Sequence, residues 1–339
     1  MKKSVGFVVV AMLASACAVS AFADTVEVVD SVGRVVQVQQ PVRRIASTYG
    51  MGTYYVYALG AGDRLVAAWY VGLKSALQAP ASFAVLEPRL GELLCSGDPN
   101  VEDLVARGAD LVLADVAKTA AVALPLEELG VPTLVLGVET AQGVVDLTLL
   151  LGSVLGEAAA ARAAALVADF YRVYGMASVA ASETPTASRP RVLFLGADPL
   201  RVASGAMYQT GLIEAAGGVS VSADLAGSWN AVSLEQILVW NPDVIVIPSY
   251  GDYTAADLLS NPDWQSVHAV RLGRVAKMPR VFGTMDTPLP ESLLGVVWLS
   301  ALFYPERATF DAPAEATAFY SAYYGYSLTS AEAEGFLTP

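Results

Sequence analysis

The stretch Ser233-Leu-Glu-Gln-Ile-Leu-Val-Trp-Asn-Pro-Asp-Val-Ile-Val-Ile-Pro248 repeats the physical pattern of an earlier one, Asn100-Val-Glu-Asp-Leu-Val-Ala-Arg-Gly-Ala-Asp-Leu-Val-Leu-Ala-Asp115. Each copy begins with a residue that can cap a helix N-terminus, and a short helix with one apolar face follows. After a helix breaker, each copy continues with an Asp and a wholly apolar four-residue strand. Such a strand is typical of a parallel sheet covered by helices on both faces. The repeat therefore predicts two α/β lobes of similar build.

Length and composition restrict the class of protein. A chain of 339 residues is longer than one hydrophobic core usually organises, so two domains are expected. The formal net charge is −13, which argues against nucleic acid as a partner, because phosphate binding needs clustered Lys and Arg. The chain has one His and two Cys, so it cannot form a metal site with three His ligands. The same counts nearly exclude a zinc site built from Cys and His ligands. We expect no resident metal and no cofactor.

The N-terminus has the pattern of a secretion signal. Two lysines precede an apolar run over residues 5–14, and a small-x-small pattern ends at Ala23. These features predict a signal peptide over residues 1–23, cleaved after Ala23. A loose lipoprotein box ending at Cys17 leaves open a protein anchored by lipid through that residue. In either case the mature protein works outside the cytoplasmic membrane, in the periplasm.

The middle of the chain predicts one long helix. Residues 140–181 hold apolar side chains at three- and four-residue spacing, and no proline interrupts them. The interior Gly152 and Gly156 each cost a helix only about 1 kcal/mol. From Pro288 onward the pattern predicts two amphipathic helices. The fold class is therefore α/β, with two doubly wound lobes of mainly parallel strands joined by one long interdomain helix. The expected divisions are an N-terminal lobe over 24–139, the helix over 140–181, a linker loop over 182–190, and a C-terminal lobe with terminal helices over 191–339.

The candidate ligand site follows from the expected sheets. In open parallel sheets, ligands bind beyond the carboxyl ends of the strands. Aromatic residues with polar tips fall in the loops at those ends, which suits a large, flat, partly apolar ligand. Ordinary packing is an equal alternative for any one of them. They are Tyr49, Tyr70, Tyr208, Trp229, Tyr250 and Tyr253. The basic residues expected near this site form no dense cluster, and they are Lys74, Arg89, Lys118 and Arg201.

Several short motifs, in the same order along the chain, resemble those of the periplasmic-binding proteins for iron chelates and cobalamin. They are Asp30-Ser-Val-Gly33, Pro41-Val-Arg-Arg44-Ile45, Ala215-Ala-Gly-Gly218, Gly273-Arg274-Val275, and Phe319-Tyr320 with Tyr323-Tyr324-Gly325. The resemblance implies two lobes joined by a long helix, with the ligand held in the cleft between them. It also implies that the chain delivers its ligand to an ABC importer. We expect a monomer, and we expect no enzyme because the sequence has no Gly-x-Ser-x-Gly elbow and its one His has no Cys or Ser context for a triad.

The resemblance carries residue roles as well. It implies that Glu102 and Glu235, one in each copy of the repeat, dock onto the importer's permease, which works with its ATPase subunits. A carboxylate in the first turn also stabilises a helix by about 0.3–1 kcal/mol through its attraction to the positive end of the helix dipole. A purely structural role for the two glutamates is therefore an alternative. Met285 and Asp286 lie in a loop that this branch of the family uses at the cleft mouth.

The ligand itself stays open among several classes. An iron complex of the siderophore or haem type is expected first, and cobalamin or an oxyanion such as molybdate or tungstate is the alternative. Fold alone does not decide among them. An extracytoplasmic enzyme and a surface adhesin are the rival classes of function.

Overall fold

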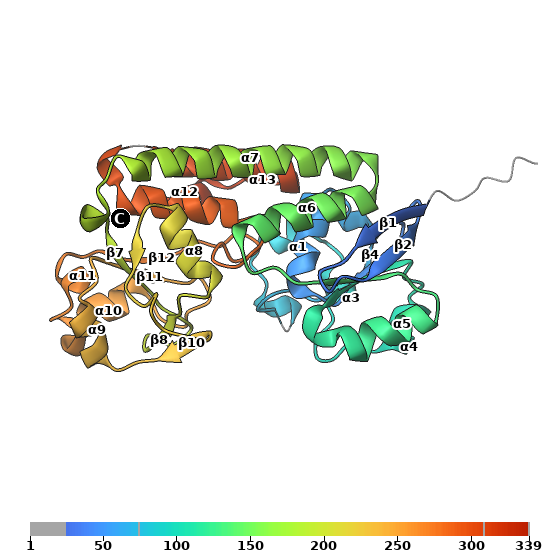
Figure 1. Cartoon of the computed structure of the whole chain (residues 1–339), viewed down its shortest axis with the longest axis horizontal. Helices are drawn as coiled ribbons and strands as arrows, with labels where there is room; N and C mark the ends of the chain where they lie inside the picture. The colour runs from blue at the N-terminus through green and yellow to red at the C-terminus, as the bar shows by residue number, and fades with distance from the viewer. Residues whose placement is uncertain (1–24, 74, 308, 338–339) are drawn as a thin grey trace, which may run out of the picture.

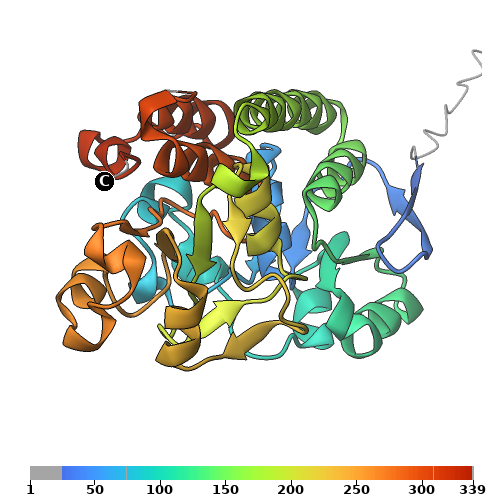
Figure 2. The same cartoon turned by 60° about the vertical axis from the view of Figure 1, so that its left-hand side comes forward.

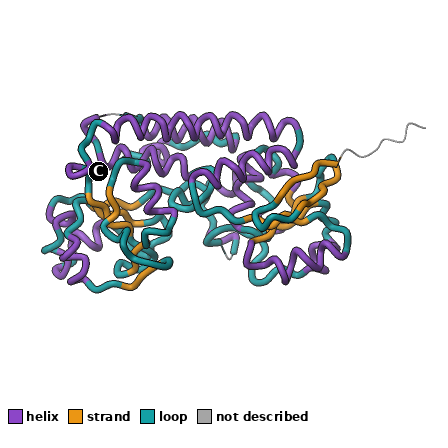
Figure 3. Tube along the Cα trace, viewed as in Figure 1, coloured by secondary structure: helices purple, strands orange, loops and turns teal. Residues whose placement is uncertain are grey.

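The computed structural model describes residues 25–73, 75–307 and 309–337. The predicted signal peptide, with Cys17 and the cleavage point at Ala23, lies outside the described residues. Figure 1 shows two lobes side by side, with the long helix α7 (Glu157–Ser182) running across both of them. Figure 3 shows the strands gathered in each lobe with helices around them. This arrangement confirms the predicted fold class.

The N-terminal lobe is built on a four-stranded parallel sheet. Its strand order is β4-β3-β5-β6, with β3 at Ile45–Ser47, β4 at Leu65–Ala68, β5 at Leu111–Asp115 and β6 at Thr133–Leu136. A separate antiparallel hairpin, β1 (Thr25–Val29) and β2 (Val35–Gln39), precedes the sheet. The helices of this lobe are α1 (Gly50–Ala58), α2 (Phe83–Leu86), α3 (Leu90–Leu93), α4 (Val101–Ala106) and α5 (Leu124–Glu128).

The C-terminal lobe has a second parallel sheet of the same size. Its order is β12-β11-β7-β9, with β7 at Arg191–Phe194, β9 at Val219–Ser220, β11 at Val244–Ile247 and β12 at Val275–Lys277. Strands β8 (Arg201–Ala203) and β10 (Trp229–Ala231) form an antiparallel pair. The helices are α8 (Tyr208–Ala215), α9 (Leu234–Trp240), α10 (Ala255–Ser260) and α11 (His268–Arg271).

The two copies of the repeat fold alike, as the pattern predicts. Asn100 caps α4 by accepting a hydrogen bond from the Asp103 amide at 2.9 Å, and Ser233 caps α9 by accepting from the Gln236 amide at 3.3 Å. The apolar strands that come next, β5 and β11, are buried at the centre of their sheets. A polar cap and a buried central strand are both local consequences of the sequence.

The prediction of one continuous helix over residues 140–181 is wrong. The chain forms α6 (Ala141–Leu155) and then turns at Gly156, whose φ of 100° lies in the region that glycine adopts readily. Helices α6 and α7 pack against each other, and a Cβ on Gly152 would lie 2.5 Å from the Ala163 Cβ. The two glycines therefore allow a turn and a close helix contact. Only α7 spans the lobes, and its 26 residues make it about 39 Å long.

The C-terminal helices close the same side of the molecule as α7 and lie beside it in Figure 2. They are α12 (Ser292–Phe303), α13 (Ala312–Tyr324) and α14 (Ser330–Glu334). The expectation that α12 is amphipathic is wrong, because α7, α8 and α13 enclose it and every residue except Ala301 is buried. Within the described ranges, no helix has both the length and the apolar character needed to cross a membrane.

Candidate ligand-binding site

A cavity of about 590 Å³ lies between the two lobes. Its lining residues come from loops at the carboxyl ends of both sheets: Met51 follows β3, Val71 follows β4, Tyr250 follows β11 and Arg280 follows β12. The loop after β6, the segment before α8 and the segment that enters β10 add Glu139, Met207, Ser228 and Trp229. The start of α8 and the loop before α12 also contribute to the lining. Volumes of about 300–1,000 Å³ are typical of sites for drug-sized ligands. The cavity is therefore where the strand-end rule places a ligand, and it has the size to hold one.

Two other hollows are larger but lie elsewhere. One of about 680 Å³ runs along the outer face of α7, and one of about 750 Å³ lies between Arg89 and the end of α13. The second is lined by the Glu87–Arg89 ion pair, in which the nearest nitrogen and oxygen are 2.9 Å apart. The lining of neither includes residues of both lobes' strand-end loops, so the interlobe cavity is the candidate site.

Three of the predicted site residues line this cavity. They are Tyr208, Trp229 and Tyr250, all from the C-terminal lobe. Asp286 lies behind the wall and is fully buried, where its Oδ2 accepts hydrogen bonds from the Tyr250 hydroxyl at 2.9 Å and from Gln209 Nε2 at 3.2 Å. Direct contact of any of them with a ligand stays a prediction.

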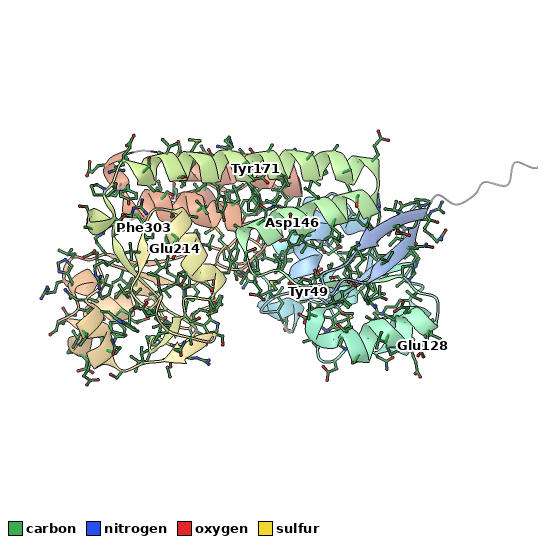
Figure 4. All side chains as sticks on the ribbon, in the orientation of Figure 1. Tyr49, Glu128, Asp146, Tyr171, Glu214 and Phe303 are labelled. Carbon is green, nitrogen blue, oxygen red and sulfur yellow. The ribbon has the colours of Figure 1, made fainter. Side chains whose placement is uncertain are left out.

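The other predicted site residues are held in the protein interior or by backbone. Tyr70 is 5% exposed and its hydroxyl contacts that of Tyr57 at 2.7 Å, while the Tyr253 hydroxyl donates to the Gly196 carbonyl at 2.9 Å. Met285 is buried under α12. Tyr49 lies in the N-terminal lobe (Figure 4), and its hydroxyl reaches the sulfur of the cavity residue Met51 at 3.8 Å. These residues are not part of the cavity lining.

The basic residue in the cavity is Arg280, which was not among those expected from the sequence. Its Nε donates to the Phe282 carbonyl at 2.9 Å and its Nη2 donates to the Val71 carbonyl at 3.4 Å. The strand-end rule could have found it, since it lies just beyond the expected edge strand. Of the described residues, the basic ones that the sequence predicted near the site do not line the cavity. Arg89 forms an ion pair with Glu87, and Lys118 forms one with Asp98. Arg201 is an exposed residue of β8, and Lys74 lies outside the described residues.

Burial perturbs the acidic groups behind the cavity. It raises the pKa of Asp286, and the hydrogen bonds from Gln209 and Tyr250 partly oppose that rise. It also raises the pKa of the fully buried Glu291 to about 7. Burial and the nearby Asp286 charge raise the pKa of the Tyr250 phenol. The phenol is therefore protonated at neutral pH and is the donor in its bond to Asp286.

No set of three or more His, Cys, Asp or Glu residues converges on a metal position in the part of the chain that the structure describes. The described lining thus offers no dense carboxylate or imidazole cluster, and its chemistry comes from aromatic, hydroxyl and guanidinium groups.

The two glutamates of the repeat lie on the surface. Glu102 is in the first turn of α4 and Glu235 is in the first turn of α9, and both are exposed. A hydrogen bond from Ser233 lowers the pKa of Glu235, so it is ionised at neutral pH. Figure 1 shows α4 and α9 at the edges of the two lobes that face away from α7.

Comparisons with known proteins agree with this architecture. A family model described as "Periplasmic binding protein" matches residues 45–281, which is more than half of the chain. Molybdate-binding protein MolA of Haemophilus influenzae is 35% identical over 105 residues, and this segment spans 30% of the chain and 30% of MolA. The chain therefore matches less than a third of that relative's length.

Solved structures resemble the chain over most of its length. A periplasmic solute binding protein from Veillonella parvula is 26% identical, with a TM-score of 0.81 over 93% of this chain and 97% of that one. The structure of Haemophilus influenzae MolA bound to molybdate is 21% identical, with a TM-score of 0.76 over 89% of this chain and 99% of that one. At that identity, the likeness to MolA's structure concerns the fold alone.

Proposed function

Because this chain belongs to the periplasmic binding protein family, we propose that it serves an ABC importer by capturing an iron complex, of the siderophore or haem type, between its lobes. Family membership confirms the resemblance seen in the sequence motifs. It also confirms the prediction of a binding protein rather than an enzyme. The chain therefore holds a small solute for transport and does not transform it.

The observation that carries the proposal is the interlobe cavity. Both lobes contribute to its lining, so a ligand there would contact two parts of the molecule at once. Trp229, Tyr208 and Tyr250 supply broad aromatic surface, and Met51 and Met207 add apolar surface that adapts to shape. Such a lining favours a bulky complex with apolar faces. A tetrahedral oxyanion would leave most of the 590 Å³ to water.

A molybdate or tungstate type of oxyanion is the second candidate. It is favoured by the 35% identity to the molybdate-binding protein MolA over 105 residues. Arg280 supplies a positive charge at the cavity, as an oxyanion requires. Cobalamin is a further alternative ligand, for which the chain would have the same role in transport.

Delivery to a permease and its ATPase subunits is the proposed use of the exposed glutamates. Glu102 and Glu235 would each meet basic residues on the permease, one from each lobe. Their position away from α7 supports this role, because it leaves the docking edge clear of the helices that join the lobes (Figure 1). The proposed location is the periplasm, after cleavage at Ala23 or with a lipid on Cys17, and the proposed state is a monomer.

The test is a thermal-shift panel on the mature chain with ferric siderophores, haem, cobalamin, molybdate and tungstate. A ligand at about 100 times its dissociation constant adds roughly 2.7 kcal/mol to the free energy of unfolding. The expected result is a clear rise in Tm with one class of iron complex. A rise with molybdate alone would favour the oxyanion, and no shift with any of them in folded, ligand-free protein would overturn the proposal.

A further inference from the structure

From the charge and hydrogen-bonding pattern of the cavity, we infer that its ligand is a metal complex of zero or single negative charge, and not a polyanion. This inference rests on the proposed function, because it describes the ligand of the same cavity. Neutral or singly charged complexes, such as hydroxamate-type chelates of Fe(III), fit the pattern. Triply charged catecholate chelates and dianionic oxyanions do not.

The cavity lining is nearly balanced in charge. Among its described residues, Arg280 and Glu139 are the two ionised side chains, and they come from opposite lobes. Arg280 is half-buried and forms no ion pair with a carboxylate of the described residues, although its charge partly opposes the rise that burial causes in the pKa values of Asp286 and Glu291. Glu139 is exposed at the edge of the N-terminal lobe. One cation and one anion favour a ligand with little net charge, because each unpaired charge on the ligand would lose its hydration without a partner.

Arg280 has room for one anionic group. Backbone carbonyls of Phe282 and Val71 hold its Nε and Nη2, so neither of these bonds uses Nη1, and the guanidinium also interacts with the buried Tyr54 hydroxyl. Nη1 lies 3.8 Å from the point that a Cβ on Gly72 would occupy, so the absence of a side chain at Gly72 keeps this side of the guanidinium open. A single carboxylate or hydroxamate oxygen could accept a charge-assisted hydrogen bond there.

Most hydroxyl groups on the wall have already donated their protons to the protein. Tyr208 donates to Ser292 at 2.8 Å, and Tyr250 donates to the buried carboxylate behind it at 2.9 Å. Thr287 donates to the Thr284 carbonyl at 2.9 Å, so the Thr284 hydroxyl is the donor in the 2.7 Å contact between the two threonine oxygens. These groups offer lone pairs to the cavity. A polyanion needs several donors, and these four hydroxyl groups offer it acceptors.

The remaining side-chain donors are few. In the described part of the chain, Trp229 Nε1 and the Ser228 hydroxyl have no hydrogen-bond partner, and both line the cavity beside the aromatic wall. Together with Arg280 Nη1, they can serve a small number of ligand oxygens. The protein as a whole carries a net charge of −13, which also opposes the approach of a polyanion at low ionic strength.

The test is isothermal titration calorimetry of the mature chain with four probes. They are a neutral ferric tris-hydroxamate, a derivative of it with one added carboxylate, a trianionic ferric tris-catecholate, and molybdate. Both hydroxamate complexes should bind about tenfold or more tightly than the tris-catecholate and molybdate. Tighter binding of the tris-catecholate or of molybdate, with the hydroxamates weak, would overturn the inference and leave the transport role standing.

Variants of Arg280 make the test specific. Arg280→Gln should weaken the carboxylated complex by about tenfold relative to the neutral one, and Arg280→Lys should restore part of that difference. Equal losses for the two hydroxamates in Arg280→Gln would overturn the assignment of Nη1 as the anion contact. If none of the probes binds to protein with a normal unfolding transition, the inference fails, and a rise in Tm with haem in the thermal-shift panel would still support the proposed function.

Discussion

The Tyr250 hydroxyl donates a hydrogen bond of 2.9 Å to Asp286 Oδ2, so a residue of the cavity wall is held by a carboxylate that is itself 0% exposed. Gln209 donates to the same oxygen at 3.2 Å, while Asp286 Oδ1 and Gln209 Oε1 have no partner among the described residues. The hydrogen bond between Tyr250 and Asp286 fixes the orientation of the Tyr250 side chain in the cavity wall. It also concentrates unpaired polar atoms directly behind the candidate site.

Removing the Tyr250 hydroxyl should lower the stability of the ligand-free protein. Tyr250→Phe takes a donor from a buried carboxylate, so we expect the free energy of unfolding to fall by about 1.5–3 kcal/mol. The matched control is Tyr253→Phe, whose hydroxyl donates to the neutral Gly196 carbonyl at 2.9 Å and should cost only about 0.5–1.5 kcal/mol. Denaturant unfolding measures both. Equal losses of unfolding free energy in the two variants would mean that the hydrogen bond from Tyr250 does not stabilise the buried Asp286 carboxylate.

The stability of the protein should fall as the pH rises through the range in which Glu291 titrates. Burial raises the pKa of Glu291 from 4.5 to about 7, so the folded state holds this proton more tightly than the unfolded state does. Between these two pH values the folded state binds more protons than the unfolded state, and the free energy of unfolding decreases with rising pH by up to about 3–4 kcal/mol for this group. The raised pKa of Asp286 acts in the same direction.

Glu291→Gln tests this dependence, because glutamine resembles the protonated acid. The Gly283 amide donates to Glu291 Oε1 at 3.1 Å, and the glutamine side-chain oxygen can accept the same hydrogen bond. Unfolding free energies at pH 5 and pH 7.5 should differ less in the variant than in the unmodified chain. The same pH dependence in both would show that Glu291 does not supply it.

The contact between α6 and α7 should tolerate no side chain at Gly152. A Cβ there would lie 2.5 Å from the Ala163 Cβ, so Gly152→Ala should destabilise the protein by about 1–3 kcal/mol despite the better helix propensity of alanine. Gly175→Ala in α7 is the control, because nothing lies within 4 Å of its Cβ position, and it should stabilise by roughly 0.5–1 kcal/mol. Thermal unfolding compares them. A stabilised Gly152→Ala variant would contradict the close crossing.

Transport should depend on the glutamates of the repeat more than ligand binding does. Glu235→Ala and Glu102→Ala should leave the ligand dissociation constant unchanged and lower uptake through the permease, because both side chains are exposed and lie outside the cavity lining. Glu128, labelled in Figure 4 at the end of α5, is an exposed carboxylate outside the repeat. Glu128→Ala is therefore the matched control for uptake. Normal uptake by the repeat variants would remove the docking role.

Several features of the fold could be predicted because they depend on neighbouring residues. The helix caps at Asn100 and Ser233 and the buried strands β5 and β11 arise within each copy of the repeat. The break at Gly156 could not be predicted from propensity, because a glycine costs a helix little and only the packing of α6 on α7 selects a φ of 100° there. The enclosure of α12 on all sides likewise depends on which helices surround it.

For the candidate site, the loops that could hold a ligand were predictable, since strand ends and their aromatic residues follow from local pattern and from the strand-end rule. Which side chains line the cavity and which support it depends on long-range packing. Tyr250 meets Asp286 from 36 residues away, and Tyr55 donates to the Pro288 carbonyl across 233 residues. Arg280 reaches the cavity because carbonyls of two different lobes hold it. Such contacts depend on how the lobes pack together, and no local pattern carries that information.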